Sequence, residues 1–493
     1  MSTQLQRRHS ERSEESGPAV RGGKIPFRCA PRNDTGSVAL VVAFVIALLA
    51  VPCAFAQTGP TKLKPDWDRA IERGVEWCAP VGVEPASGLL LCTKDARVDL
   101  IDLETGRSRV TAAIPVQPGT QFAGAEGAVA YGYGVSRIYA FLGKRSGKTK
   151  DLRPGLFWSV VGAPQEDTQG DPEFMTRIIA AQATPNGVLV VRSDGRVAEL
   201  IGGDGRVRWQ NRLPEIRQCR LHVQDTSAAL FWKEGCELNV AFFDLRADEP
   251  EAKLVKVKGS PPIWTTLVGE RLLAVWPKQF GVISSDGSRW FEPLDPRCWA
   301  TTQTVAVYVD PTQPTREAEG SPASPLLLVG SDLICVYDLS SGLLRTPSEC
   351  GLRTPIKPED ICLTLRLSGD LVLCTGMSCL RVARLLPSIE TVAEHRLEGL
   401  AIDVGVHRDC AYGLFWDMSD RFQRGSAEFR PHLVLVKTAM KLPSAISTAE
   451  TRLSDAREFI LEEGESAVYS QTFWIGERLL IVDDRRIRAY TLP

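Results

Sequence analysis

The sequence has almost no net charge, and it has few histidines. Across 493 residues, 58 Lys and Arg stand against 60 Asp and Glu, and five residues are His. With a net charge near −2 there is no basic field to release counterions from DNA or RNA, so nucleic-acid binding is not expected. Gly and Pro contribute 41 and 32 residues, too few for a collagen-like or low-complexity chain, and 44% hydrophobic content indicates a folded protein.

Motifs that carry chemistry are absent as well. No C-x-x-C occurs, and the later histidines form no ligand-like pair, so no metal site is predicted. There is no pair of adjacent cysteines, and the nearest approach to G-x-S-x-G, Gly376-Met377-Ser378, lacks the second Gly. The sequence therefore identifies no catalytic, cofactor-binding or metal-ligating residue and predicts no cofactor. A Ser-His-Asp site assembled only in three dimensions stays open.

One long hydrophobic run is present near the N-terminus. Val38–Ala56 contains nineteen residues without a charge and ends in Ala54-Phe55-Ala56, which places small residues before Gln57. This pattern predicts a signal peptide over residues 36–56 and an exported, periplasmic or extracellular protein. Nineteen apolar residues also suffice to span a bilayer, so an uncleaved single-pass N-terminal anchor is the alternative, and only this form would involve the membrane.

The segment before that run differs from the rest of the chain. Residues 1–35 carry seven basic and four acidic side chains and show no apolar periodicity, which predicts a disordered tail. The segment resembles a translated bacterial intergenic repeat, so the true start of the protein is expected downstream. Without the tail the chain has 51 basic and 56 acidic residues, a net charge near −5.

The chain has enough cysteines to form disulfides if the protein is exported. Eleven of the thirteen follow the predicted signal peptide, and in an oxidising compartment they can pair. The spacing favours two short-loop disulfides, Cys78 with Cys92 and Cys219 with Cys236, and leaves the connectivity of the later seven open. Because eleven is odd, at least one thiol stays free, and a buried free Cys is the alternative for several of them.

A repeated unit begins at Gly88. Each copy has a short apolar run, a polar break, a second alternating run and a turn with Gly, clearest at Gly88–Arg107, Gly187–Trp209 and Leu326–Leu344. Nine unit starts between residues 88 and 475 give a mean spacing of about 48 residues. That period, with four short strands in each unit, is typical of a propeller blade.

Turn residues recur at matching places in these units. Asp102–Gly106 and Asp338–Gly342 occupy one such place, as do Gly203–Gly205 and Ser285–Gly287. Gly supplies the positive φ that tight turns need, and Asp bonds to nearby amides. A second echo, Gly-Glu-Arg-Leu-Leu, begins at residues 269 and 476.

Helix is predicted in two places only. Asp66–Trp77 sets Trp67, Ile71 and Val75 on one face, which predicts a short helix within an N-terminal helical segment over residues 57–87. Thr451–Glu463 is the second candidate. Residues 88–493 are expected to form the propeller.

The repeat resembles the quinoprotein-like propellers built from PQQ-type repeats. In that family an outer strand commonly carries Gly and then Trp, as Gly205–Trp209 does, and Gly287–Trp290 is one residue short of the same spacing. The resemblance implies an all-β propeller of four-stranded blades. The nine hairpins of the repeated units predict about eight blades, because the first and last chain segments are expected to share one blade and close the ring. Seven blades is the alternative.

The predicted function is recognition without catalysis. A rigid ring of blades that presents loops suits an exported binding or scaffolding protein, with a protein, small-molecule or glycan ligand that stays unidentified. The chain is expected to be a monomer. The alternative is a periplasmic propeller enzyme of quinoprotein, hydrolase or lyase type with its site at the central channel.

Overall fold

The computed structural model divides the chain into two units, residues 1–59 and 60–493. The residues it describes all lie in the second unit: 61–81, 88–109, 113–126, 129–142, 156–161, 177–202, 205–296, 298–309, 325–330, 334–339, 362–376, 379–385, 390–396, 399–417, 432–440, 456–463 and 471–493. The predicted tail and signal peptide lie outside these ranges. No helix in the described ranges is long and apolar enough to cross a membrane.

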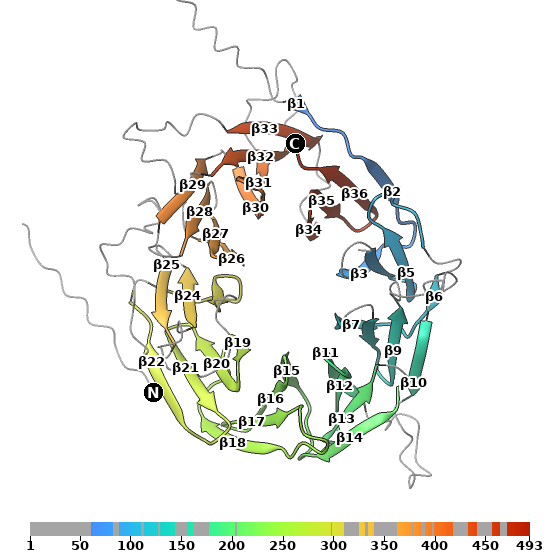
Figure 1. Cartoon of the computed structure of the whole chain (residues 1–493), viewed down its shortest axis with the longest axis vertical. Helices are drawn as coiled ribbons and strands as arrows, with labels where there is room; N and C mark the ends of the chain where they lie inside the picture. The colour runs from blue at the N-terminus through green and yellow to red at the C-terminus, as the bar shows by residue number, and fades with distance from the viewer. Residues whose placement is uncertain are drawn as a thin grey trace, which may run out of the picture. The chain divides into compact units, whose positions relative to one another are not determined.

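Nine sheets follow one another around a ring in the described part of the second unit (Figure 1). In seven of the nine sheets the strands run outward from the ring axis in chain order, and the other two add β1 or β2 as the outermost strand. We call the sheets blades 1 to 9. The first five blades are β3 (Val75–Val81), β4 (Gly88–Thr93), β5 (Arg97–Asp102) and β6 (Ile114–Pro115); β7 (Gln121–Glu126), β8 (Val129–Tyr133), β9 (Arg137–Leu142) and β10 (Leu156–Val161); β11 (Ile178–Thr184), β12 (Gly187–Arg192), β13 (Arg196–Ile201) and β14 (Val207–Arg212); β15 (Cys219–Gln224), β16 (Ser227–Glu234), β17 (Glu237–Asp244) and β18 (Lys253–Lys258); and β19 (Trp264–Val268), β20 (Arg271–Trp276), β21 (Gln279–Ser284) and β22 (Arg289–Pro293).

The remaining four blades complete the ring. They are β23 (Val305–Tyr308), β24 (Leu326–Gly330) and β25 (Ile334–Asp338); β26 (Thr364–Ser368), β27 (Leu371–Thr375), β28 (Cys379–Arg384) and β29 (Glu390–Arg396); β30 (Gly399–His407), β31 (Cys410–Asp417), β32 (His432–Ala439) and β33 (Arg457–Glu463), with β1 (Thr61–Lys62) parallel to β33; and β34 (Gln471–Ile475), β35 (Arg478–Val482) and β36 (Arg486–Thr491), with β2 (Trp67–Ala70) outside β36.

The prediction of eight blades, or seven, is wrong, because the described strands form nine sheets. Each of the nine hairpins visible in the sequence belongs to a sheet of its own. The prediction subtracted one blade for ring closure, but closure uses a strand outside those hairpins. Strand β2, from the start of the chain, pairs with β36 at its end.

The predicted helices are also wrong, since the described residues contain none. Asp66–Trp77 holds β2 and the start of β3, separated by a turn in which Gly74 has a φ of +72°. In β2 the side chains alternate between half-buried and exposed, the period of a strand at the edge of a sheet. In the second candidate, Arg457–Glu463 forms β33, and residues 451–455 lie outside the described ranges.

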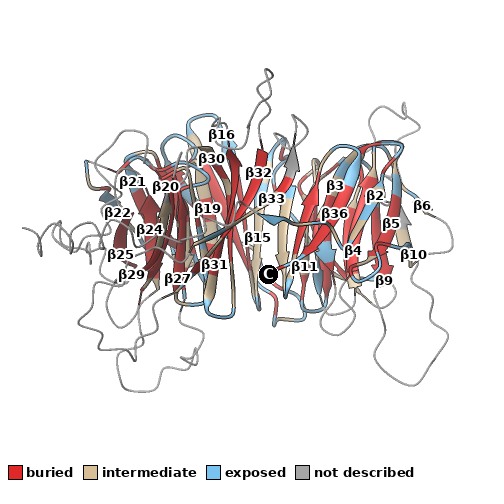
Figure 2. Cartoon of the chain, turned by 90° about the horizontal axis from the view of Figure 1, so that it is seen from above, coloured by how far each residue is buried: buried red, intermediate tan, exposed pale blue. Residues whose placement is uncertain are grey.

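The middle strands of the blades form the core. β12 and β4 are buried at five consecutive positions, because a neighbouring blade covers each face of the sheet. Buried residues accordingly run through the strands, while exposed residues gather at the loops (Figure 2). Each interface between blades holds its own apolar cluster, as where Leu230 and Trp232 of blade 4 meet Leu189 and Trp209 of blade 3.

The predicted equivalence of the turns is confirmed where the structure describes them. Gly106, Gly205 and Gly287 lie between the third and fourth strands of their blades, with φ of +67°, +72° and +86°. Asp102 Oδ1 accepts from the amides of Glu104 and Thr105, each at 2.9 Å. Residues 340–342 lie outside the described ranges. The recurrence of this turn confirms that the units repeat.

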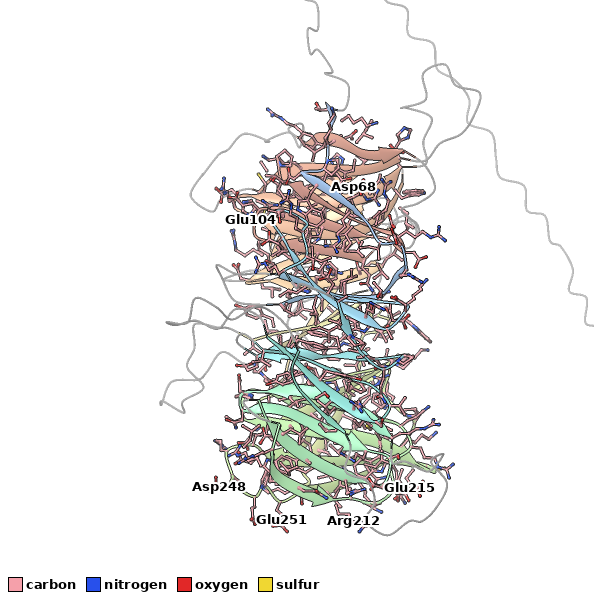
Figure 3. All side chains as sticks on the ribbon, turned by 90° about the vertical axis from the view of Figure 1, so that its right-hand side faces the viewer. Asp68, Glu104, Arg212, Glu215, Asp248 and Glu251 are labelled. Carbon is pink, nitrogen blue, oxygen red and sulfur yellow. The ribbon has the colours of Figure 1, made fainter. Side chains whose placement is uncertain are left out.

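These loops define the two faces of the ring. Glu104 and Asp248, from the loops between third and fourth strands, project at one face, whereas Glu215, from the connection between blades 3 and 4, lies at the other (Figure 3). We call the first the hairpin face and the second the connection face.

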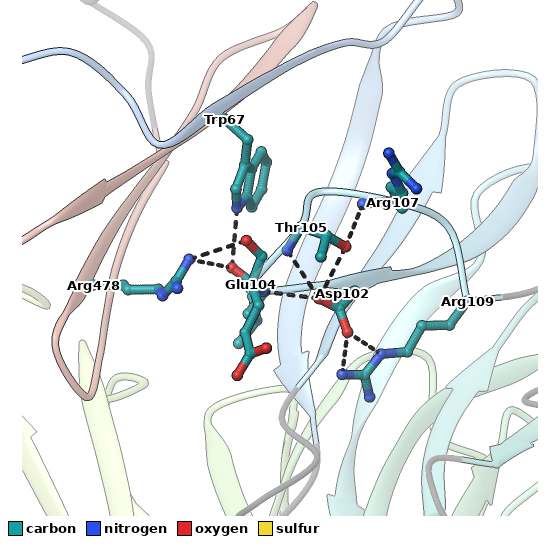
Figure 4. A network of polar contacts seen from close by, with 8 residues as sticks. Trp67, Asp102, Glu104, Thr105, Arg107, Arg109 and Arg478 are labelled. Carbon is teal, nitrogen blue, oxygen red and sulfur yellow. Dashed lines mark hydrogen bonds and ion pairs between the residues drawn. The ribbon is translucent and has the colours of Figure 1, made fainter.

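Blade 9 is fastened to blade 1 by side chains of both its outer and its inner half (Figure 4). Trp67 Nε1 on β2 donates to Leu103 O at 3.0 Å, and Arg478 Nη1 donates to the same oxygen at 2.8 Å. A Cβ built on Gly106 would lie 2.6 Å from the Trp67 ring, so the indole rests directly on the turn. The indole and this turn therefore add polar and packing contacts to the apolar cluster that blades 9 and 1 share.

We expect Trp67→Ala to lower the free energy of unfolding by about 2 kcal/mol, because it removes the indole packing and the bond to Leu103 at the closing interface. The matched control is Trp299→Ala, at an indole that is 53% exposed and has Lys278 Nζ 5.3 Å from its centroid. Its loss should stay below about 1 kcal/mol. Urea unfolding followed by fluorescence measures both, and equal losses would contradict the closing role.

Candidate functional site

The first place to look for chemistry is the inner strands. Asp403 on β30 is 2% exposed and follows a bulge in that strand. Its Oδ1 pairs with Arg366 Nη1 of β26 at 2.8 Å and accepts from the Val404 amide at 2.8 Å. Its Oδ2 accepts from Trp474 Nε1 of β34 at 3.0 Å and from the Thr472 hydroxyl. Both oxygens are fully used, so this carboxylate joins blades 7, 8 and 9 and has no free position for a substrate.

His222 is the second candidate on the inner strands. Its Nε2 lies 2.6 Å from the Thr265 hydroxyl oxygen of the next inner strand, β19. Burial, aided by the charge of Arg220, lowers the pKa of His222 from 6.5 to about 4. The imidazole is thus neutral at pH 7 and a weak base, which suits a structural link between blades 4 and 5 better than proton abstraction.

Among the described residues, no group of three or more His, Cys, Asp or Glu side chains is placed to hold a metal ion. The tryptophans also stay mostly inside. Trp232 and Trp416, which occupy matching positions in two units, are 3% and 6% exposed. Among the tryptophans that the structure describes, only Trp299 is largely exposed. The described residues therefore form no aromatic rim of several tryptophans for a peptide or sugar.

The predicted cysteine pair in blade 1 is not joined in the structure. Cys78 and Cys92 have free thiols on neighbouring strands. Cys78 lies opposite Leu91, and Cys92 lies opposite Trp77, so the two cysteines are one register position apart and their side chains leave the sheet on opposite faces. Cys78 packs toward blade 9 and Cys92 toward blade 2. The spacing of the two cysteines in the sequence does not show that their side chains lie on opposite faces of the sheet.

The second predicted pair, in blade 4, is likewise unjoined. Cys219 is half-buried at the start of β15 and lies opposite Trp232. Cys236 is exposed in the turn between β16 and β17, beyond the point where β15 begins. The described residues contain no disulfide.

A hollow of about 380 Å³ lies on the hairpin face between blades 4 and 5. Four loops or strand ends of these two blades form it: the start of β16, the end of β17 with the loop to β18, the β19–β20 turn and the β21–β22 turn. The lining residues are Ser227, Ala228, Phe242, Phe243, Asp244, Arg246, Ala247, Pro250, Glu251, Lys253, Glu270 and Ser285. Its volume falls in the range of small-ligand sites.

Ion pairs hold the two sides of this hollow together. Arg246 Nε donates to Asp244 Oδ1 at 2.8 Å within blade 4, and Arg246 Nη2 donates to Glu270 Oε1 of blade 5 at 3.1 Å. The hydrogen bonds from Arg246 hold the pKa of Asp244 below its ordinary value. The guanidinium therefore bridges the blade interface at the mouth of the hollow.

The rim of the hollow is acidic. The loop after β17 reads Asp248-Glu249-Pro250-Glu251, and its three carboxylates are exposed. Figure 3 shows Asp248 and Glu251 projecting from this edge of the ring. Together with Asp244 and Glu270 these carboxylates number five. They outnumber three nearby cations, which are Arg246, Lys253 and Arg208, whose Nη2 lies 3.8 Å from Asp248 Oδ1, so the hollow presents a negative potential to solvent.

Sequence reasoning missed this site. Its residues come from four loops between residues 227 and 285, and no local motif links them. The acidic run at 248–251 is the one signal in the sequence, and alone it is typical of any solvated loop.

No family model matches the chain, and no curated protein matches it. Similar solved structures include BamB from Moraxella catarrhalis, with 11% identity, 71% of this chain and 96% of that chain covered, and a TM-score of 0.39. A second is the WD40 domain of SCAP from fission yeast, with 10% identity, 87% of this chain and 98% of that chain covered, and a TM-score of 0.44. A third is the computationally designed Ika8 protein, with 10% identity, 88% of this chain and 100% of that chain covered, and a TM-score of 0.41. These likenesses are too weak to carry an inference about function. The propeller fold and its nine blades follow from the strand pairing within this chain. The likeness of its repeat to the PQQ-type repeat is a resemblance in sequence only.

The low pKa of His222 gives a pH-dependent stability. The folded protein binds a proton on this imidazole less readily than the unfolded chain, so stability present above pH 6.5 is lost as the pH falls from 6.5 toward 4. We expect the His222→Gln variant to lose about 2 kcal/mol less than the unaltered protein between pH 7 and pH 5. Urea unfolding at both pH values measures the difference. Parallel losses in the two proteins would show that His222 is not the group responsible.

Proposed function

We propose that this protein is an exported β-propeller that serves as a binding scaffold, and that the hollow between blades 4 and 5 receives a cationic segment of a protein partner. The observation that carries the proposal is the acidic rim around an open hollow that spans two blades. Carboxylates near the mouth would attract Lys or Arg side chains.

The geometry of the ring supports this role. Strands and turns packed into the blades hold the loops, so a bound segment meets side chains that are already positioned. Arg246 is engaged by Asp244 and Glu270, which keeps the guanidinium from repelling a cationic ligand as a free charge would. The enzyme alternative gains no support from Asp403 or His222, since the first has both oxygens bonded and the second is a weak base.

Site-specific photocrosslinking tests the binding surface. We expect p-benzoylphenylalanine in place of Glu249 to give a discrete crosslinked product in cells, and the same residue in place of Glu215 on the connection face to give none. Because attraction between exposed charges is screened by salt, the product should decline as salt is raised in extracts.

Charge reversal provides the matched control for that experiment. Asp248→Lys combined with Glu251→Lys should abolish the product while leaving the unfolding midpoint unchanged, because both side chains are exposed. Equal crosslinking from positions 249 and 215, or a product that survives the reversal, would contradict the proposed site.

Export is part of the same proposal and rests on Val38–Ala56. We expect the mature protein in a bacterial host to appear outside the cytoplasm as a monomer, with an intact mass that corresponds to a chain beginning at Gln57. A full-length chain retained in the membrane fraction would establish the uncleaved anchor instead.

A further inference from the structure

Two pairs of buried sulfur atoms lie unusually close together on either side of blade 6. The first pair is Cys298, in the connection from β22 to β23, and Cys335 on β25, with 2.8 Å between their Sγ atoms. They are 3% and 1% exposed. The second pair is Cys362, just before β26, and Cys374 on β27, with 2.9 Å between Sγ atoms and 2% exposure at each residue.

The backbone around the first pair holds it in place. The Cys298 amide donates to Asp295 O at 2.7 Å, closing a turn, and the Asp295 amide donates to the Tyr337 hydroxyl at 2.7 Å. Tyr337 is two residues after Cys335 on β25, so it projects from the same face of the sheet. The turn that carries Cys298 is therefore docked on the very strand that carries Cys335.

The second pair is held in a similar way between blades 6 and 7. The Leu363 amide donates to Thr375 O at 2.7 Å, which fixes the chain beside Cys362 to the residue after Cys374. A Cβ on Gly330 of β24 would lie 2.7 Å from Cys362 Sγ, so this sulfur rests against the backbone of blade 6. All four cysteines belong to the apolar clusters on the two sides of that blade.

Separations of 2.8 and 2.9 Å are shorter than unbonded sulfur atoms ordinarily adopt and need only a small closure to reach a covalent bond of about 2.05 Å. We propose that Cys298 with Cys335 and Cys362 with Cys374 form two disulfides in the exported protein, fastening the chain that enters blade 6 and the chain that enters blade 7. The presence of an oxidant in the cell rests on the proposed export, whereas the choice of partners rests on this geometry.

The reaction is thiol–disulfide exchange with an oxidised dithiol protein or oxidised glutathione. For each pair, both thiols lose their protons, one thiolate attacks the oxidant to give a mixed disulfide, and the second displaces it. One protein S–S bond forms, one oxidant S–S bond breaks, and the oxidant leaves as two thiols. Two electrons pass from each cysteine pair to the oxidant.

Burial dictates when this reaction takes place. In the folded ring the four sulfurs are shielded from reagents, and the hydrogen bond with Cys362, with burial second, raises the pKa of Cys374 well above its ordinary value. Little thiolate would form at Cys374, and exchange needs thiolate. We therefore place bond formation before the blades close, and we expect the finished bonds to resist reductant until the protein unfolds.

The decisive experiment maps the bonds in full-length protein refolded in a glutathione redox buffer. Free thiols are alkylated in denaturant, the protein is digested without reduction, and linked peptides are identified by mass spectrometry. We expect linked peptides joining Cys298 to Cys335 and Cys362 to Cys374, with Cys78 and Cys92 alkylated. Alkylation of all four proposed cysteines, or their linkage to other partners, would overturn the pairing.

Variants and cellular material sharpen the result. Cys298→Ser should free Cys335 for alkylation, leave the other bond intact and lower the thermal midpoint by roughly 5 °C, whereas Cys236→Ser in the exposed turn should change none of these. If Cys298→Ser fails to fold, mapping of the unaltered protein still decides. Protein recovered from cells separates the two proposals: correct bonds in vitro but free thiols in cells would refute export and keep the pairing.

Discussion

The closing contact between the two ends of the ring is the constraint on which the rest of the structure depends. Strand β2 pairs with β36, and Arg486 reaches Asp68 across 418 positions of sequence. Every blade is buried on both faces only when this contact is made, because an open ring would expose the apolar cluster that blades 9 and 1 share. Since the contact joins β2 to the last strand, β36, the complete core requires both ends of the ring to be present, with a high cost in loop-closure entropy.

The same requirement explains how far the fold follows from the sequence. The middle strands are covered on both faces and therefore appear in the sequence as apolar runs, and Gly106, Gly205 and Gly287 mark the turns that follow. The repeated unit and the propeller fold could therefore be predicted. The blade count was not, because the closing strand Trp67–Ala70 is four residues long and belongs to no repeat. Trp67 and Ile71 are four positions apart, a spacing that is typical of one face of a helix. The segment nevertheless forms a strand, because its pairing with β36, more than 400 residues away, outweighs that local preference.

Sites were harder to predict than strands because they depend on which side of a sheet a residue occupies. Cys78 and Cys92 are close in sequence yet project from opposite faces, while Cys298 and Cys335, 37 positions apart, meet in one interface cluster. A shift of one residue in register reverses the face, and spacing alone does not reveal register. The hollow poses the same difficulty, since Arg246 and Glu270 meet only because blades 4 and 5 are neighbours.

The interfaces between blades thus carry both stability and recognition. At the closing interface Trp67 and Arg478 donate to one backbone oxygen, and between blades 3 and 4 Arg208 Nη1 reaches Leu245 O in the loop that leads to the acidic rim. Because one side of the hollow belongs to blade 4 and the other to blade 5, a ligand that contacts both sides would oppose the separation of the two blades. Binding and ring integrity are then linked: a partner that prefers the closed ring stabilises it, and a loosened ring binds that partner less tightly.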